Sequence, residues 1–222
     1  MRFGVIIPAF NEEHNIAGVV AKALSYADTV VVVDDGSSDS TAAVAHAAGA
    51  AVVSHDRNKG KGAAIKTGFA YLRDLGFEGA ITLDADGQHD PAEIPAFVQE
   101  AAKGYDMVIG NRMGDVATMP LIRRFANYAS SLLTTLFLKQ HIPDSQNGYR
   151  YYRLATVAVL PLEADKYDFE TEVIFRAARA RYRIGFVPTR TIYRSEARSK
   201  VNSLTDTLRF IGILLRYGLR RT

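Results

Sequence analysis

Residues 29–39, TVVVVDDGSSD, contain a run of four valines that leads directly into two aspartates and a glycine-serine turn. The next segment, STAAVAHAAG (40–49), places apolar residues at helical spacing and ends in glycine. Unbroken valine runs are typical of strands covered on both faces, and such strands belong to parallel sheets with helices on both sides. This stretch therefore predicts one strand-turn-helix unit of a doubly wound α/β fold.

The same alternation continues on both sides of this unit. We expect further strands at 3–10, 51–56, 79–86 and 105–112, separated by helices at 12–27, 61–76 and 91–104. The second half is less regular, with expected helices at 121–138 and 169–182 and expected strands at 148–153 and 184–194. The predicted organisation is one α/β domain with a mostly parallel sheet over residues 1–202, followed by a C-terminal amphipathic helix over residues 203–222.

The composition limits the possible functions. The 222 residues include no cysteine, which excludes disulfides, zinc–thiolate sites and thiol nucleophiles and fits a reducing compartment. The net charge of +3 argues against a polycation that coats nucleic acid, so we expect no nucleic-acid partner. No run of about 18 uncharged apolar residues is present, so no transmembrane helix is expected. The apolar run at residues 4–10 is also too short for a signal peptide.

Charged and polar residues gather where the predicted strands end. In doubly wound sheets, ligands bind beyond the carboxyl ends of the strands, and these ends meet at one edge. The residues placed there are Asn11, Glu12, Asp34, Asp35, Asp84, Asp86 and Arg112. We expect Asn11 to cap the first helix, with Glu12 or Glu13 in its first turn.

Asp84 and Asp86 form the most informative pair, within LDADGQHDP (83–91). Two acids separated by one residue at a strand end can point the same way and share a Mg²⁺ or Mn²⁺ ion, and Gln88 could add an oxygen or orient a water. A plain turn is one alternative, because Asp and Gly are common in turns. A phosphorylated aspartate, as in haloacid-dehalogenase-like phosphatases, is another. Three earlier strands and Gln88 in place of threonine argue against it.

A glycine-rich segment, NKGKGAAIKTG (58–68), resembles a phosphate-binding loop only superficially. Ile65 stands where a Gly-x-Gly-x-x-Gly motif needs its third glycine, and no Gly-Lys-Ser or Gly-Lys-Thr is present. We therefore expect an ordinary helix start whose lysines could meet an anion.

Taken together, these motifs resemble those of family 2 glycosyltransferases with the GT-A fold. The resemblance rests on VIIPAFNEE (5–13), VVDDGSSDST (32–41), NKGKGAAIKTG (58–68), LDADGQHDP (83–91) and VIGNR (108–112). Three further segments are similar to the polyprenyl-phosphate (dolichyl-phosphate) branch of the family, namely DSQNGYRYY (144–152), YDFETEVI (167–174) and EARSKVN (196–202). The resemblance covers roughly residues 3–202.

The resemblance implies an inverting transfer of a hexosyl group from a nucleotide sugar, GDP-mannose or a UDP-sugar, to a polyprenyl phosphate. It implies that Mg²⁺ or Mn²⁺ is held by Asp84, Asp86 and Gln88. The implied nucleotide-binding residues are Pro8, Ala9, Phe10, Glu12, Asp35, Asp84 and Ala85. The implied catalytic residues are Asp86, Arg112 and Lys200, and the implied contacts of the acceptor phosphate are Arg112, Arg124, Ser199 and Lys200.

Several alternatives stay open at this point. The same fold and donor could serve a glycan or another soluble acceptor, and a non-catalytic nucleotide-binding module is a more distant possibility. Ser145, Gln146 and Asn147 could line the sugar site or only cap a loop. The helices at 121–138, with Arg123 and Arg124, and at 203–220 could pack in the core, contact another subunit in a homo-oligomer, or lie on an anionic membrane. We expect peripheral attachment at the cytoplasmic face of a cell membrane.

Overall fold

The computed structural model describes residues 1–114, 119, 121–192 and 212. The strands are β1 (Phe3–Ala9), β2 (Val30–Asp34), β3 (Ala51–Ser54), β4 (Gly79–Thr82), β5 (Met107–Asn111), β6 (Arg150–Arg153) and β7 (Ile184–Pro188). The helices are α1 (Ile16–Leu24), α2 (Thr41–Ala47), α3 (Lys61–Asp74), the short 3-10 helix η1 (Pro91–Glu93), α4 (Ile94–Ala101), α5 (Leu121–Leu138), α6 (Leu154–Val157) and α7 (Phe169–Arg179).

The strands form one seven-stranded sheet in the order β3-β2-β1-β4-β6-β5-β7. All of them run in the same direction except β6, which is antiparallel to both of its neighbours, β4 and β5. Strand β6 therefore separates β4, which leads to the paired aspartates, from β5, which leads to Arg112. The predicted mostly parallel α/β sheet is confirmed.

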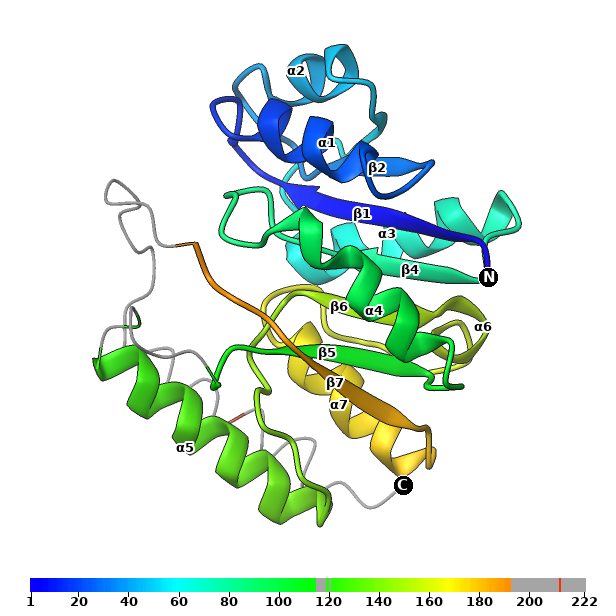
Figure 1. The fold of residues 1–222 in the computed structure, drawn as a ribbon. Helices are drawn as coiled ribbons and strands as arrows, with labels where there is room; N and C mark the ends of the chain where they lie inside the picture. Colours follow the sequence, from blue (N-terminus) through cyan, green and yellow to red (C-terminus); the bar gives the residue numbers. More distant parts are fainter. Residues whose placement is uncertain (115–118, 120, 193–211, 213–222) are drawn as a thin grey trace.

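Helices cover both faces of the sheet (Figure 1). On one face, α1 and α4 bury Ile16, Val20 and Phe97 against side chains such as Ile7 and Val32. On the other face, α3 and α7 pack their apolar side chains against the alternate residues of the same strands. Because neighbouring residues of one strand are buried on opposite faces, the valine and isoleucine runs are explained by a core on each side.

Several element ends differ from the prediction; the strand expected at 79–86, for example, ends at Thr82. Helix α1 begins at Ile16 and not near Glu12, because Asn11 adopts a left-handed conformation with φ 54°. The Asn11 side chain accepts a hydrogen bond from the backbone N–H of Ser38 (2.9 Å), so it fixes the turn after β2 and does not cap its own helix. Strand β7 ends at Pro188, where its partner β5 ends at Asn111, so the strand expected at 184–194 is shorter.

Other predictions concern the second half of the chain. Helix α5 has the predicted bounds. In the described part of the chain, no helix combines the length and hydropathy needed to span a bilayer. The residues Ser199 and Lys200 and, apart from residue 212, the helix expected at 203–220 lie outside the described residues, so their predicted roles stay predictions.

Candidate active site

The carboxyl edge of the sheet brings the predicted residues together. Pro8 and Ala9 end β1 and are followed by Phe10 and Glu12, and Asp34 ends β2 and is followed by Asp35. The loop after β4 carries Asp84, Ala85 and Asp86, and Arg112 follows β5. Strands β2, β1 and β4 are direct neighbours, so the first three groups are adjacent along this edge.

Asp35 already has several partners within the protein. Its carboxylate interacts with the ring Nδ1 of His55 (2.7 Å) and accepts hydrogen bonds from the backbone N–H groups of Lys59 (2.9 Å) and Gly60 (2.8 Å). The residue is buried and therefore fixes the segment that leads into α3. The contact with a nucleoside that the resemblance implies for Asp35 stays a prediction. The adjacent Asp34 accepts hydrogen bonds from Ser37 in the same turn.

Asp84 is held by a lysine that the sequence did not identify as its partner. The Asp84 carboxylate lies 2.6 Å from Nζ of Lys61, the first residue of α3. Burial alone would raise the pKa of Asp84, but the charge and hydrogen bond of Lys61 outweigh it and lower the pKa from 3.8 to about 2. Asp84 is thus ionised at neutral pH.

His89 supports the same loop as a neutral ring. It is buried, and burial lowers its pKa from 6.5 to about 4 despite the nearby charge of Asp84. Its Nδ1 accepts a hydrogen bond from the backbone N–H of Asp84 (3.1 Å). Asp90 accepts a hydrogen bond from the backbone N–H of Ala92 (2.9 Å) and so caps η1.

Asp86 is in a different electrostatic position. It accepts a hydrogen bond from the backbone N–H of Gln88 (2.9 Å). Burial and the negative charge of Asp84, with a smaller effect of Glu12, raise its pKa. Three carboxyl groups, those of Asp84, Asp86 and Glu12, therefore lie near one another, and Lys61 is one positive charge among them.

These residues fit a divalent cation that is completed by a substrate. Among the described residues, no three acidic or histidine side chains converge into a metal site. Magnesium is commonly held by one or two carboxylates together with phosphate oxygens of the substrate. Asp84 and Asp86 match that donor set, and an added cation would relieve the repulsion that raises the pKa of Asp86. The assignment of Gln88 as a third ligand stays a prediction.

Lys61 joins Asp84 to a second acid. Its Nζ lies 2.8 Å from Oε1 of Glu170, which is buried in the first turn of α7. Burial would lower the pKa of Lys61, but the two carboxylates raise it, so the amine stays protonated. The sequence signal for this pair was weak, because 109 positions separate its members.

The backbone of Gly148 passes close to this ion pair. A Cβ atom at this position would lie 2.8 Å from Nζ of Lys61 and 3.2 Å from both carboxylate oxygens of Asp84. Any other residue here would displace the lysine. Thr82 fixes the same backbone by donating a hydrogen bond to the Gly148 carbonyl (2.8 Å).

Arg112 occupies the other side of β6, where it is held by a buried acid. Its Nε and Nη2 donate to the two carboxylate oxygens of Asp144 (2.8 and 2.9 Å), and its backbone N–H donates to Asp144 as well (3.1 Å). Asp144 is fully buried. The guanidinium is therefore fixed in orientation, and Asp144 is a residue that the sequence analysis missed.

Helix α5 turns its polar side chains inward and its large apolar side chains outward. Ser130, Ser131 and Thr134 are buried, and the serines hydrogen-bond with Ser145. The exposed side includes an apolar row at helical spacing, namely Leu121 (78% exposed), Phe125 (76%), Tyr128 (61%), Leu132 (45%) and Leu136 (63%). The exposed Arg124 lies on the same helix, and α5 itself lies at the periphery of the molecule (Figure 1).

Ser145 and Asn147 are both fully buried. Ser145 bonds to the serines of α5, and the Asn147 side chain donates to Thr189 (3.1 Å). The contacts of these two residues hold their loop in place. Whether either also meets a sugar stays a prediction.

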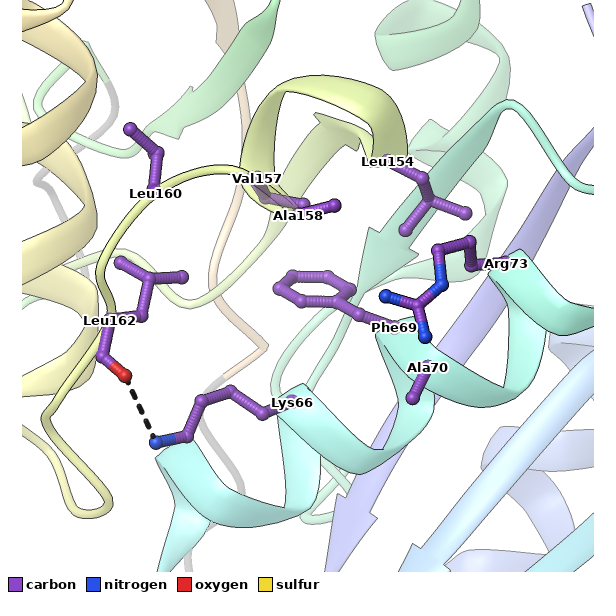
Figure 2. Close-up of a pocket in the computed structure, with 9 residues that line it drawn as sticks. All are labelled: Lys66, Phe69, Ala70, Arg73, Leu154, Val157, Ala158, Leu160 and Leu162. Atoms are coloured by element: carbon purple, nitrogen blue, oxygen red, sulfur yellow. Dashed lines mark hydrogen bonds between the residues drawn. The ribbon is translucent and has the colours of Figure 1, made fainter.

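A pocket of about 190 Å³ lies at another part of the molecule (Figure 2). Its walls are mostly apolar and come from α3, α6 and the following segment, with Phe69 and Leu162 among the lining residues. Lys66 donates a hydrogen bond to the Leu162 carbonyl at its rim (3.4 Å). Leu154, also in its wall, bonds through its backbone N–H to Glu78, next to the amino end of β4. The pocket is thus remote from the carboxyl edge.

Comparison with known proteins gives consistent results. The sequence profile of "Glycosyl transferase family 2" matches residues 4–158. A UDP-N-acetylglucosamine–dolichyl-phosphate N-acetylglucosaminyltransferase of Methanococcus voltae is 32% identical over 85% of this chain and 85% of its own length. An undecaprenyl-phosphate mannosyltransferase of Micrococcus luteus is 32% identical over 91% of this chain and 88% of its own length.

Solved structures of similar fold include glucosyl-3-phosphoglycerate synthase from Mycobacterium tuberculosis. Its complex with Mn²⁺, UDP-glucose and phosphoglyceric acid aligns with a TM-score of 0.77 and 22% identity, covering 100% of this chain and 81% of that one. At this identity the likeness concerns the fold alone. It confirms the predicted GT-A architecture.

Proposed function

Because the chain belongs to glycosyl transferase family 2 and is a glycosyltransferase, we propose that it transfers a hexosyl group from a nucleotide sugar to a polyprenyl phosphate with inversion at the sugar carbon. The observation that carries this proposal is the arrangement at the carboxyl edge. An acidic pair suited to a cation lies on one side of β6, and an arginine held by Asp144 lies on the other.

The donor side is proposed to be formed by the segments after β1, β2 and β4. Asp84 and Asp86, with Gln88, would hold Mg²⁺ or Mn²⁺. The bound ion supplies Lewis-acid chemistry that offsets the negative charge of the departing nucleoside diphosphate. The protonated amine of Lys61 adds a positive charge at the same place, and the segment from Pro8 to Phe10 is proposed to meet the nucleoside.

The acceptor side is proposed to bind a phosphate monoester. The relatives from Methanococcus and Micrococcus are named for dolichyl-phosphate and undecaprenyl-phosphate substrates. Asp144 already occupies the Nε–Nη2 edge of Arg112, so a phosphate would meet the rest of a guanidinium whose orientation is fixed before binding. A phosphate acceptor is already anionic at neutral pH, so attack on the sugar does not require a strong general base. Arg124, Ser199 and Lys200 are further proposed contacts.

We also propose that the apolar row of α5 contacts the bilayer that carries the acceptor. Residues 116–143 contain no acidic side chain, while Arg123, Arg124 and Lys139 are basic. A helix with large apolar side chains outward and only positive charge suits the surface of an anionic membrane. Attachment at the cytoplasmic face, and a homo-oligomer, remain predictions.

A transfer assay tests the proposal. Purified protein is incubated with radiolabelled GDP-mannose, UDP-glucose or UDP-N-acetylglucosamine and undecaprenyl phosphate, with Mn²⁺, with Mg²⁺ or with EDTA. We expect an organic-soluble product with at least one donor, lost with EDTA and in Asp86→Asn. A parallel reaction contains 3-phosphoglycerate as a soluble acceptor. Transfer to that acceptor and none to the lipid would refute the lipid acceptor, and full activity in EDTA would refute the metal.

A further inference from the structure

Arg150 is the largest side chain that is fully buried in the described structure. Its guanidinium donates three hydrogen bonds, from Nε to the carbonyl of Asn147 (2.6 Å), from Nη1 to the carbonyl of Glu170 (2.7 Å) and from Nη2 to the carbonyl of Ser145 (2.9 Å). The three acceptors belong to two segments that are distant in the sequence. Arg150 therefore ties the loop 144–149, here called the central loop, to the first turn of α7.

The position of Arg150 in the sheet is central to the site. It is the first residue of β6, and it pairs with Thr82 of β4 and with Ile109 of β5. Asp84 follows Thr82 by two residues, and Arg112 follows Ile109 by three. The arginine thus lies between the strand that leads to the donor side and the strand that leads to the acceptor side.

Arg150 is linked to both sides of the site through intermediate residues. Toward the donor side, it holds Glu170, whose side chain binds Lys61, which binds Asp84. Toward the acceptor side, it holds the carbonyl of Ser145, next to Asp144, and Asp144 fixes Arg112. The central loop also touches the donor side directly through Gly148.

This arrangement is costly for stability alone. Within the described part of the chain, no ion pair joins Arg150 to a carboxylate, so the charge is compensated by carbonyl dipoles. A buried charge without a carboxylate carries a large desolvation cost, and well-packed apolar side chains are often at least as stable. Three acceptors that each bond to a different nitrogen of one guanidinium require the fork of arginine, which a lysine cannot reproduce.

We propose that Arg150 is a positioning residue that sets the location of Asp84 relative to Arg112, and so aligns the nucleotide sugar with the acceptor phosphate. This inference rests on the proposed function. Its consequence is that one substitution at the buried Arg150 weakens the binding of both the nucleotide and the acceptor phosphate, which bind on opposite sides of β6.

The test compares Arg150→Lys with Arg153→Lys in the full chain. Arg153 lies at the other end of the same strand and pairs with Asp106 (3.4 Å), so it is a matched control. Binding of UDP and GDP with Mn²⁺, and of citronellyl phosphate as a short polyprenyl phosphate, is measured by titration calorimetry. Steady-state KM for donor and acceptor and kcat are measured where transfer occurs, and the melting temperature is recorded for each protein.

In Arg150→Lys we expect both affinities to weaken by about tenfold, as for other residues that orient ligand-binding side chains. Arg153→Lys should leave both within about twofold. A lower melting temperature with both affinities unchanged, or a loss confined to one ligand, would overturn the inference. If Arg150→Lys does not fold, Arg150→Met replaces it, because methionine removes the buried charge together with its desolvation cost and also removes the three hydrogen bonds. The same two affinities are then measured, and a loss confined to one ligand again overturns the inference.

Failure of the proposed function would look different. A wild-type protein that binds nucleotide and phosphate but transfers no sugar to a polyprenyl phosphate refutes the reaction. The two affinities in Arg150→Lys still decide whether this residue positions both sides.

Discussion

Replacing Lys61 with methionine should destabilise the folded protein in a pH-dependent way. Methionine keeps the apolar stem but removes the charge that lies 2.6 Å from Asp84 and 2.8 Å from Glu170. The depression of the Asp84 pKa from 3.8 to about 2 corresponds to about 1–2 kcal/mol at neutral pH, at about 1.4 kcal/mol per pKa unit and allowing for solvent screening of a partly exposed carboxylate. The variant should lose at least this much, because burial then acts on Asp84 without an opposing cation.

The sign of the pH dependence follows from the direction of the shift. A carboxyl whose pKa is lowered in the folded state contributes stability at any pH above its pKa in the unfolded chain. That contribution is lost as the pH falls through the pKa of the folded state. For Asp84 this stabilising contribution is lost between pH 3.8 and about pH 2. The difference in stability between wild type and Lys61→Met should therefore be constant near neutral pH and shrink as the pH falls through the acidic range to about 2.

Urea unfolding followed by circular dichroism, at pH 7 and in steps down to about pH 2, measures this difference. Lys66→Met is the matched control, because Lys66 lies on the same helix and pairs with Asp165, whose side chain is 57% exposed. Its effect should be about 0.5 kcal/mol or less. Equal stability of Lys61→Met and wild type at pH 7, or a difference that does not change with pH, would refute the reasoning.

Three further results are expected. Gly148→Ala should weaken binding of UDP or GDP with Mn²⁺ by about tenfold while keeping the fold, because its Cβ would displace the Lys61 amine; unchanged calorimetric affinity would contradict this. Asp86→Asn should stabilise the metal-free protein by about 0.5–1 kcal/mol at pH 7, because the raised pKa means that its charge opposes folding there; a lower melting temperature would count against it. Phe125→Glu should reduce flotation with vesicles containing phosphatidylglycerol severalfold, whereas Val159→Glu, at an exposed position away from α5, should not; equal effects would exclude α5 as the contact.

The fold class could be predicted because strands buried on both faces need apolar residues at nearly every position. The valines of β2 are all buried, and this produces the run that the sequence displays. Helix α5 was predicted with its observed bounds from periodicity alone. The start of α1 was wrong because the Asn11 side chain bonds to Ser38, 27 positions away, and this partner is not visible in a local pattern.

The acidic residues of the candidate site could be predicted from the sequence, but the residues that hold the site in place could not. Asp84 and Asp86 stand out because two acids at a strand end need a counter-charge. Lys61 and Asp144, which hold Asp84 and Arg112, come from a helix start and a loop whose places depend on the sheet order. That order could not be read from the sequence, because β6 enters the sheet between two strands made before it.

This late insertion of β6 sets an order for folding during synthesis. Strands β3, β2, β1 and β4 pair with one another, so they can form a sheet once residue 82 has left the ribosome. Strand β5 is connected to them only through β6, so the edge of β4 stays open until residues 150–153 are made. The strands of the half that carries Asp84 can therefore pair first. A ribosome that stalls between residues 82 and 150 leaves a strand edge open to neighbouring nascent chains.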